Sequence, residues 1–269
     1  MTVYRDDLGE QASVSDLEAL SGKRRGAKLD AIRDACRSYL AGPLYDALAH
    51  HVQVATAGQG AVSIDPDDAT GQTLLIAYPS VRVEAGSYVR PVVRIESGAK
   101  SALDTNRPVT IHPFIADDAV GIDLAVPGVT TIEPSRTFWD KVVILNGLRR
   151  WYERRGMLRQ EGQRISRHYY DLHCMMHHAM GAPTMADRAM GADCVRHARM
   201  FFDRPDYDLA SASPGTFALA PLPEMADALA SDYEAMAGMI FGAPPSFEDV
   251  LDSIRALEAK LSGPTTART

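Results

Sequence analysis

The second half of the chain carries apolar residues at helical spacing. Phe138, Val142 and Leu145 recur every three or four residues after Pro134, and proline suits the first turn of a helix. This pattern predicts a helix that begins at Pro134 and ends near Arg155. The same spacing predicts further helices over residues 163–180, 186–202, 223–241 and 246–261, with a Pro-, Ser- and Gly-rich loop over 203–221.

The first fifty residues predict helices separated by breaks. Ser13 suits the N-cap of a short helix, and the glycine-bounded segment 22–26 predicts an interruption after it. Apolar residues at spacings of three and four over 29–40 predict an amphipathic helix. We expect Gly42-Pro43 to interrupt this helix, and a second helix to run as far as His50.

The middle of the chain predicts β-structure. Short apolar or alternating runs, bounded by Pro, Gly, Asp and Ser, lie at residues 73–78, 91–96, 109–112 and 122–126. Strands followed by helices indicate an α+β protein. We expect an α/β domain over residues 1–133 and an all-helical domain over residues 134–269.

Composition narrows the class of protein. The chain has 269 residues, of which 46% are hydrophobic and 23% charged, values that are ordinary for a soluble globular protein. No apolar run approaches the roughly 20 residues that span a bilayer, and the N-terminus does not resemble a signal peptide. Three widely spaced cysteines fit a reducing compartment. We therefore expect a cytoplasmic protein without membrane partners.

Arginine is concentrated in one segment of this acidic chain. The net charge is −7, yet residues 149–167 hold seven arginines against two glutamates. One interpretation is a solvated helix end followed by a loop. The other is a phosphate-binding patch for nucleotide or RNA.

Two predicted helices carry residues suited to anion binding. Lys141 lies beside the apolar stripe of its helix, where it could extend to solvent or reach a phosphate as a point charge. Arg164, Arg167, His168 and Asp171 are spaced to share one helix face. Asp171 could pair with Arg167 along its own helix, or with Lys141 across two helices. A Lys–Asp–Arg cluster of this kind suits a triphosphate.

Carboxylates and histidines suggest weaker candidates. Glu96 closes a predicted strand, where it could bind a divalent ion or simply be a strand-edge charge. Asp65-Pro66-Asp67-Asp68 reads as a turn rather than a metal-binding strand. The segment that holds His173, Cys174, His177 and His178 lacks the pattern of a metalloprotease helix, and we interpret it as a core cysteine with surface histidines.

The segment Thr137-Phe138-Trp139-Asp140-Lys141 with Arg167-His168-Tyr169-Tyr170-Asp171-Leu172 resembles the AbiEii/AbiGii toxin family of nucleotidyltransferases. The resemblance covers residues 74–261, and it includes the predicted strands at 75–79 and 93–98 and the segment 232–247. It implies a nucleotidyltransferase-like mixed sheet followed by a helical domain. It also implies a bacterial toxin of a type IV toxin–antitoxin or abortive-infection system.

The resemblance implies an activity and a site. Relatives transfer a nucleotide from an NTP to RNA, some of them to the acceptor end of tRNA, with Mg²⁺. Lys141 would hold the NTP phosphates, with Arg164, Arg167 and His168 around them, and Asp171 would be an essential polar partner. Glu96 would be a carboxylate for the metal. The expected partners are NTP, an RNA acceptor, for which we predict tRNA, and a cognate antitoxin.

The beginning of the sequence departs from the family pattern. The family opens with a Gly-Gly-Thr/Ser turn and a strand with paired acids, and nothing before Tyr39 fits that unit. Thr2-Val3-Tyr4-Arg5 looks like the residues that would follow it. We therefore expect a domain that is incomplete at its N-terminus and a homo-oligomer that covers the open sheet edge. The alternative function is an inactive member that still binds nucleotide, RNA or antitoxin.

Overall fold

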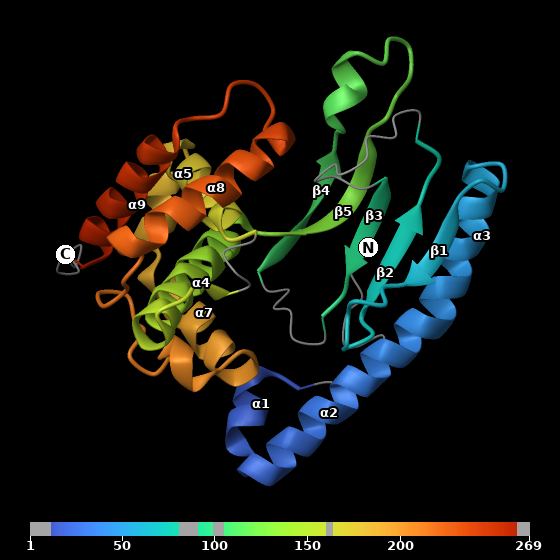
Figure 1. Ribbon diagram of the computed structural model, residues 1–269. Coiled ribbons are helices and arrows are strands. Elements are labelled where there is room, and N and C mark those ends of the chain that lie inside the picture. The colour runs from blue at the N-terminus through green and yellow to red at the C-terminus, as the bar shows by residue number, and fades with distance from the viewer. Residues whose placement is uncertain (1–11, 81–90, 99–104, 160–163, 263–269) are drawn as a thin grey trace. The chain divides into compact units, whose positions relative to one another are not determined.

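The structure is a computed structural model that describes residues 12–80, 91–98, 105–159 and 164–262 (Figure 1). The chain divides into two compact units, of which the first ends at Leu103 and the second begins at Asp104. Helices and short antiparallel strands occur in both units, which confirms the α+β class. The segment Thr2–Arg5, which the resemblance singled out, lies outside the described residues.

The first unit begins with helices α1 (Val14–Ala19) and α2 (Gly22–Tyr39). Ser13 and Asp16 form a capping box, which confirms the predicted start of α1. The predicted interruption over residues 22–26 is wrong, because α2 starts directly at Gly22. The Arg25 Nε donates to the Leu17 carbonyl at 2.9 Å, so this residue joins the first turn of α2 to the end of α1.

Gly42-Pro43 widens the helix without ending it. Residues Leu40–Leu44 form a π-helical turn that contains Pro43, and α3 (Tyr45–Ala55) continues from it. A proline cannot donate the usual helical hydrogen bond, and a π-turn accommodates that loss. α3 ends at Ala55, beyond His50, where we expected the helix to end.

A small antiparallel sheet completes the first unit. Strands β1 (Ala61–Ile64), β2 (Thr73–Ala77) and β3 (Val92–Glu96) lie in the order β1-β2-β3. The predicted strands at 73–78 and 91–96 are confirmed, whereas β1 was not predicted from its short sequence. Leu74 on the central strand lies opposite Ile64 and Ile95, and it is the most deeply buried residue of the sheet.

The second unit opens with a hairpin of β4 (Asn106–Ile111) and β5 (Val126–Ile132), which pair antiparallel. The predicted strand at 122–126 is wrong, since the Asp123 carboxylate accepts the N–H of Ala125 in a local turn. The strand itself follows that turn, through Pro127 and Gly128. All strand pairs in the described parts of the chain are antiparallel, so a mixed sheet stays a prediction.

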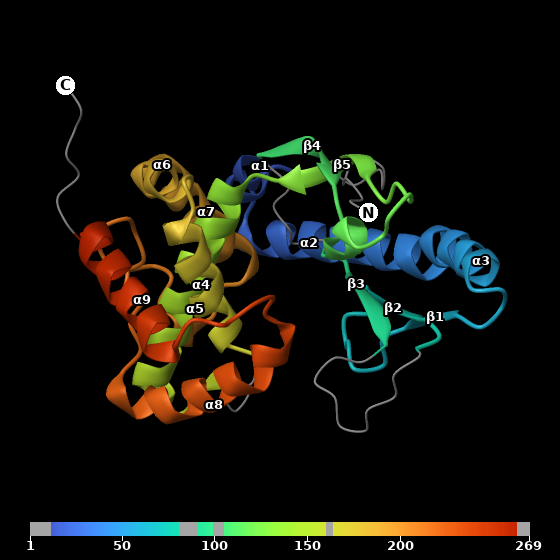
Figure 2. The ribbon, with the colours of Figure 1, turned by 90° about the horizontal axis from the view of Figure 1, so that it is seen from above.

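Helices form the rest of the second unit (Figure 2). They are α4 (Pro134–Arg155), α5 (Ser166–His177), α6 (Gly181–Ala186), α7 (Arg188–Phe201), α8 (Ala226–Met236) and α9 (Phe247–Ser262). α4 packs against α5 and α7, and α5 packs against α8 and α9. The helix predicted over 223–241 is α8 with a short 3₁₀ turn at each end. The start of α4 at Pro134 agrees with the sequence, and the domain boundary expected there stays a prediction.

The helical core is built on aromatic residues of α4 and α5. Phe138, Trp139 and Tyr169 are fully buried. The Trp139 indole N–H donates to the Thr184 carbonyl at 3.1 Å, and its ring faces Gly191 of α7. A Cβ at Gly191 would lie 2.7 Å from the indole, so only glycine allows this close approach. Among the described helices, none combines the length and the apolar composition that crossing a membrane requires.

Candidate functional site

The site centres on Lys141, which α4 holds beside its buried stripe. The Lys141 Nζ lies 2.5 Å from the Asp171 Oδ2 and 3.1 Å from the His168 Nδ1, and both partners belong to α5. The pairing of Lys141 with Asp171 across two helices is therefore confirmed. The lysine side chain is only 19% exposed, so its ammonium is held at the rim of the core. Among the described residues, these two partners engage two of its three N–H donors, and the third could serve a ligand oxygen.

His168 is a neutral member of this cluster. Burial, reinforced by the charges of Lys141 and Arg167, lowers the pKa of His168 to about 3. The imidazole is therefore uncharged at neutral pH, and its Nδ1 accepts a hydrogen bond from the Lys141 ammonium. Its ring N–H is consequently on Nε2. Sequence reasoning placed His168 near the site without anticipating this contact, because it depends on how α4 and α5 pack.

The start of α5 is fixed by a carboxylate from another helix. Asp232 of α8 accepts the backbone N–H groups of Arg164, Ile165 and Ser166 at 2.6, 2.8 and 2.7 Å. These donors have no partner inside their own helix, and a carboxylate also suits the positive end of the helix dipole. The Ser166 hydroxyl donates to the Leu229 carbonyl, which ties the same turn to α8. α8 thereby sets the position of the helix that carries His168 and Asp171.

Arg164 does not share the helix face that we predicted. α5 begins at Ser166, and Arg164 precedes it with a positive φ of 56°. Arg167 lies on the first turn of α5 and is exposed. The predicted ion pair of Arg167 with Asp171 does not occur among the described ion pairs, because the Asp171 carboxylate is directed to Lys141. The four-residue face is therefore reduced to Arg167, His168 and Asp171.

Glu96 belongs to the first unit, at the end of β3. Its Oε1 lies 2.8 Å from the Nε of Arg94, and the same guanidinium lies 3.2 Å from the carboxylate of Asp65, which is almost fully buried. A paired arginine replaces the positive charge that a metal would supply. In the described parts of the chain, no group of three His, Cys, Asp or Glu side chains is arranged to hold a metal ion. Arg94 therefore pairs with both carboxylates, and the role of Glu96 as a metal carboxylate stays a prediction.

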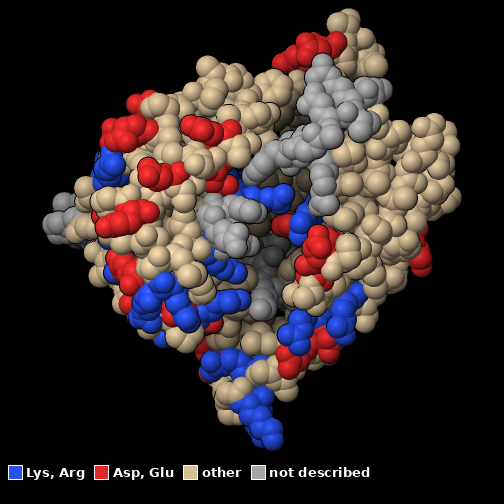
Figure 3. Space-filling model, in the orientation of Figure 1, with Lys and Arg blue, Asp and Glu red and all other residues tan. Residues whose placement is uncertain are grey.

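The arginines of residues 149–159 mostly bind the loop at 203–221. Arg155 pairs with Asp206 at 2.6 Å, and Arg154 donates to the Pro205 carbonyl. Arg149 donates to the carbonyl of Ala220, and Arg159 lies over the ring of Tyr207. On the face of the helical unit shown in Figure 3, basic side chains gather toward the lower part, and acidic side chains lie beside and above them. These contacts favour a structural role for this segment over a continuous phosphate-binding patch.

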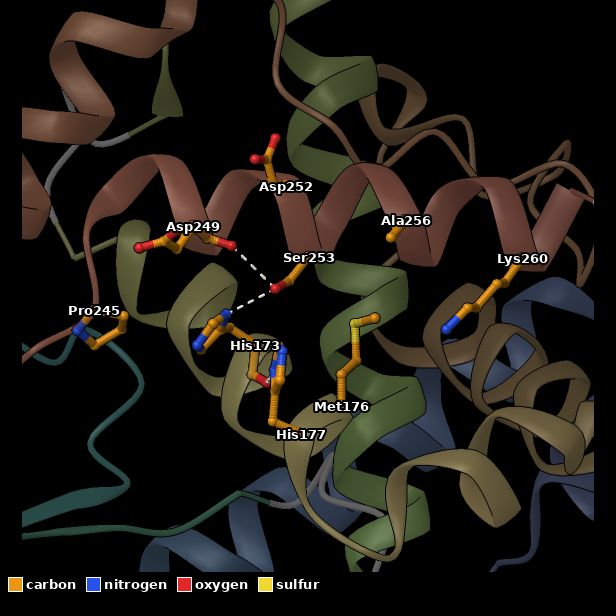
Figure 4. Close-up of a pocket in the computed structure, with 9 residues that line it drawn as sticks. All are labelled: His173, Met176, His177, Pro245, Asp249, Asp252, Ser253, Ala256 and Lys260. Atoms are coloured by element: carbon orange, nitrogen blue, oxygen red, sulfur yellow. Dashed lines mark hydrogen bonds between the residues drawn. The ribbon is translucent and has the colours of Figure 1, made fainter.

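A pocket of about 720 Å³ lies between α5 and α9 (Figure 4). The Ser253 hydroxyl donates to the Asp249 carbonyl at 3.0 Å, and the Nδ1 of His173 lies 2.8 Å from the same hydroxyl oxygen. In this arrangement the Ser253 proton is directed to the Asp249 carbonyl rather than to His173. Cys174 is exposed, so our interpretation of it as a core cysteine is wrong. All three cysteines are free.

Comparison with known proteins identifies the family of this chain. No curated protein and no solved structure matches the chain at a significant level. A family model described as "Nucleotidyl transferase AbiEii toxin, Type IV TA system" matches residues 16–253. The match includes α4, α5 and α8, and hence the Lys141–Asp171 pair and the Asp232 cap. Because it spans most of the chain, the chain belongs to the AbiEii family of nucleotidyltransferase toxins of type IV toxin–antitoxin systems.

Proposed function

We propose that this chain transfers a nucleoside monophosphate from an NTP to an RNA acceptor, with tRNA as the first acceptor to test. The family provides the nucleotidyltransferase chemistry, and a type IV toxin–antitoxin system implies a cognate antitoxin. The observation that carries the proposal is the Lys141 ammonium, which is held by Asp171 and His168 and has one donor remaining. Such a donor suits a phosphate oxygen of the NTP.

The contacts of the three side chains support a different task for each in the proposed reaction. Lys141 would contact the NTP phosphates, and its charge would stabilise the negative charge that develops as pyrophosphate leaves. Asp171 and His168 would hold the ammonium in place, so that little reorganisation is needed when the phosphates bind. Arg167 is exposed and lies one turn before Asp171 on α5, so it would add a second cation beside the phosphates.

The test is transfer of label from each α-labelled NTP to total tRNA in the presence of Mg²⁺. We expect label on tRNA with the native chain, and a loss of about 100-fold or more with Lys141→Ala, in line with the loss of a transition-state contact. Lys260→Ala is the matched control, because Lys260 is an exposed lysine on α9. This control should transfer label at the native rate.

Absence of label with every NTP and tRNA would contradict the proposed transfer to tRNA. Binding of an NTP that Lys141→Ala weakens, without any transfer, would instead support the inactive, nucleotide-binding alternative. Equal rates for the native chain and Lys141→Ala would remove Lys141 from the site. Circular dichroism of each variant shows whether the fold is retained.

A further inference from the structure

An exposed apolar surface lies on the second unit, away from the Lys141 cluster in the sequence. Phe114, in the connection between β4 and β5, stacks on Phe241, which follows α8, with ring centroids 4.9 Å apart and an interplanar angle of 20°. Each phenylalanine is 80% exposed. Ile115, Val120 and Ile122, from the same connection, are also largely exposed. We call these five residues the Phe114–Phe241 patch.

The patch joins two segments that are far apart in the sequence. The β4–β5 connection extends from its hairpin as a separate projection, and the segment after α8 lies beside it (Figure 1). An exposed large apolar side chain is ordinary when it is isolated. Here two exposed aromatic rings stack on each other, and three more exposed apolar residues belong to the same connection as Phe114. A gathering of this kind is typical of a protein-interaction site.

The charge around the patch indicates what kind of surface it would bind. Residues 108–135 and 205–254 contain no lysine or arginine. Three exposed aspartates, Asp117, Asp118 and Asp123, lie on the same connection as Phe114, and acidic side chains are visible at its end in Figure 3. Their charge would repel a nucleic-acid backbone, and a second copy of the same patch would place acids against acids. A partner surface with an apolar centre and a basic rim is complementary to the Phe114–Phe241 patch.

We propose that the Phe114–Phe241 patch is a docking surface for a protein that presents apolar residues surrounded by lysine or arginine. The aromatic pair supplies the buried centre of the interface, and the aspartates supply its rim. Centre residues of this type dominate the free energy of binding, whereas rim charges mainly affect association rate and salt dependence. The proposal is independent of the transfer reaction, because it uses none of the residues of the Lys141 cluster.

The probes are two labelled helical peptides with the same leucine stripe, one with lysines and one with glutamates at all other positions. Fluorescence anisotropy measures their binding to the full chain. We expect the lysine peptide to bind and the glutamate peptide to bind at least about tenfold more weakly, because opposite charges meet at the rim. Phe114→Ser/Phe241→Ser should weaken lysine-peptide binding by about tenfold or more, as expected for residues at the centre of an interface.

Two further variants separate the centre of the patch from its rim. Asp117→Asn/Asp118→Asn should weaken lysine-peptide binding mainly at low salt. Met157→Ser, which changes an exposed apolar residue outside the patch, should bind like the native chain. Equal binding of both peptides, or native affinity in the Phe114→Ser/Phe241→Ser variant, would overturn the proposal. So would loss of self-association or of single-stranded RNA binding in that variant, since these would identify a second copy or RNA as the occupant. Unchanged circular dichroism and Tm would show that these surface variants fold.

Discussion

A single ammonium group at the surface of the helical core is held by two partners of different kinds. Asp171 supplies opposite charge to Lys141, whereas His168 supplies a neutral acceptor. A second carboxylate in place of His168 would leave the cluster with a net negative charge and weaken its attraction for phosphate. A protonated histidine would repel the lysine. Keeping His168 neutral therefore preserves both the geometry and the electrostatics of the cluster.

The neutrality of His168 predicts a pH dependence of stability. The pKa of His168 is about 3 in the folded chain and about 6.5 in an unfolded one. Between these values the unfolded chain binds a proton that the folded chain does not, so the stabilising contribution is present above pH 6.5 and is lost as the pH falls toward 3. We expect the native chain to lose about 1 to 2 kcal/mol more unfolding free energy than His168→Asn between pH 7 and pH 5.

Urea denaturation at the two pH values measures this difference. Asparagine is the matched replacement, because its amide oxygen can accept a hydrogen bond from Lys141 but does not titrate. If the stability of the native chain and of His168→Asn fell in parallel, His168 would not be the titrating group.

Helix α5 depends on contacts that other helices make with its ends and sides. The N–H groups of Ser166 and of the two residues before it donate to Asp232 of α8, so one carboxylate accepts three donors at the start of α5. On the other side of the core, α7 approaches α4 closely only because Gly191 faces Trp139. The orientation of the helices around the candidate site thus rests on a few specific residues.

Removal of the cap should destabilise the protein through α5. We expect Asp232→Ala to lower the unfolding free energy by about 1 to 2 kcal/mol, since a lost N-cap costs about this much. Hydrogen exchange should accelerate over the first turns of α5. Glu234→Ala, at an exposed position of the same helix, should have little effect on either measurement. Equal effects of the two substitutions would contradict a capping role for Asp232.

The close approach of α7 to α4 leads to a second prediction at this scale. A methyl group at Gly191 would force the indole of Trp139 to move, so Gly191→Ala should lower the unfolding free energy by about 1 to 3 kcal/mol. It should also change the intrinsic fluorescence of tryptophan. Gly238→Ala is the control, because a methyl group there meets open space. Unchanged stability in Gly191→Ala would show that the two helices can separate without cost.

At the scale of the whole molecule, some charged residues are paired with opposite charges, and others lie in segments that carry only acids. Opposite charges within the second unit neutralise each other where α4 meets the loop at 203–221, as in the pair of Arg155 and Asp206. The segments 108–135 and 205–254 carry acids but no lysine or arginine of their own. The net charge of −7 is therefore unevenly distributed: arginines of α4 are paired with acids, whereas the two acidic segments contain no lysine or arginine.

The contacts between α4 and the loop predict a change in protease sensitivity. Arg149 donates to the carbonyl of Ala220, and its side chain is mostly buried. Arg149→Ala should release this end of the loop and accelerate cleavage by chymotrypsin within residues 203–221 by several-fold. Arg199→Ala, at an exposed position of α7, is the control. Equal cleavage rates in the two variants would show that the loop does not depend on Arg149.

The sequence by itself determined the elements whose signals are local. The period of apolar residues after Pro134 predicted α4. A short apolar run that ends at a proline predicted β2, and an alternating run that ends before a glycine predicted β3. The Ser13 cap was also readable, since its partner Asp16 is only three residues away. The motif around Lys141 and Asp171 indicated the family that the match over residues 16–253 shows.

Only the tertiary structure decided which partner each charged side chain takes. The Asp171 carboxylate could pair with Arg167 or Lys141 from the sequence, and helix packing directs it to Lys141. Arg164 was predicted on the face of α5, but capping by Asp232 starts the helix after it. Hydrogen bonds and ion pairs act over a few ångströms, so they depend on residues that the fold brings together from distant parts of the chain.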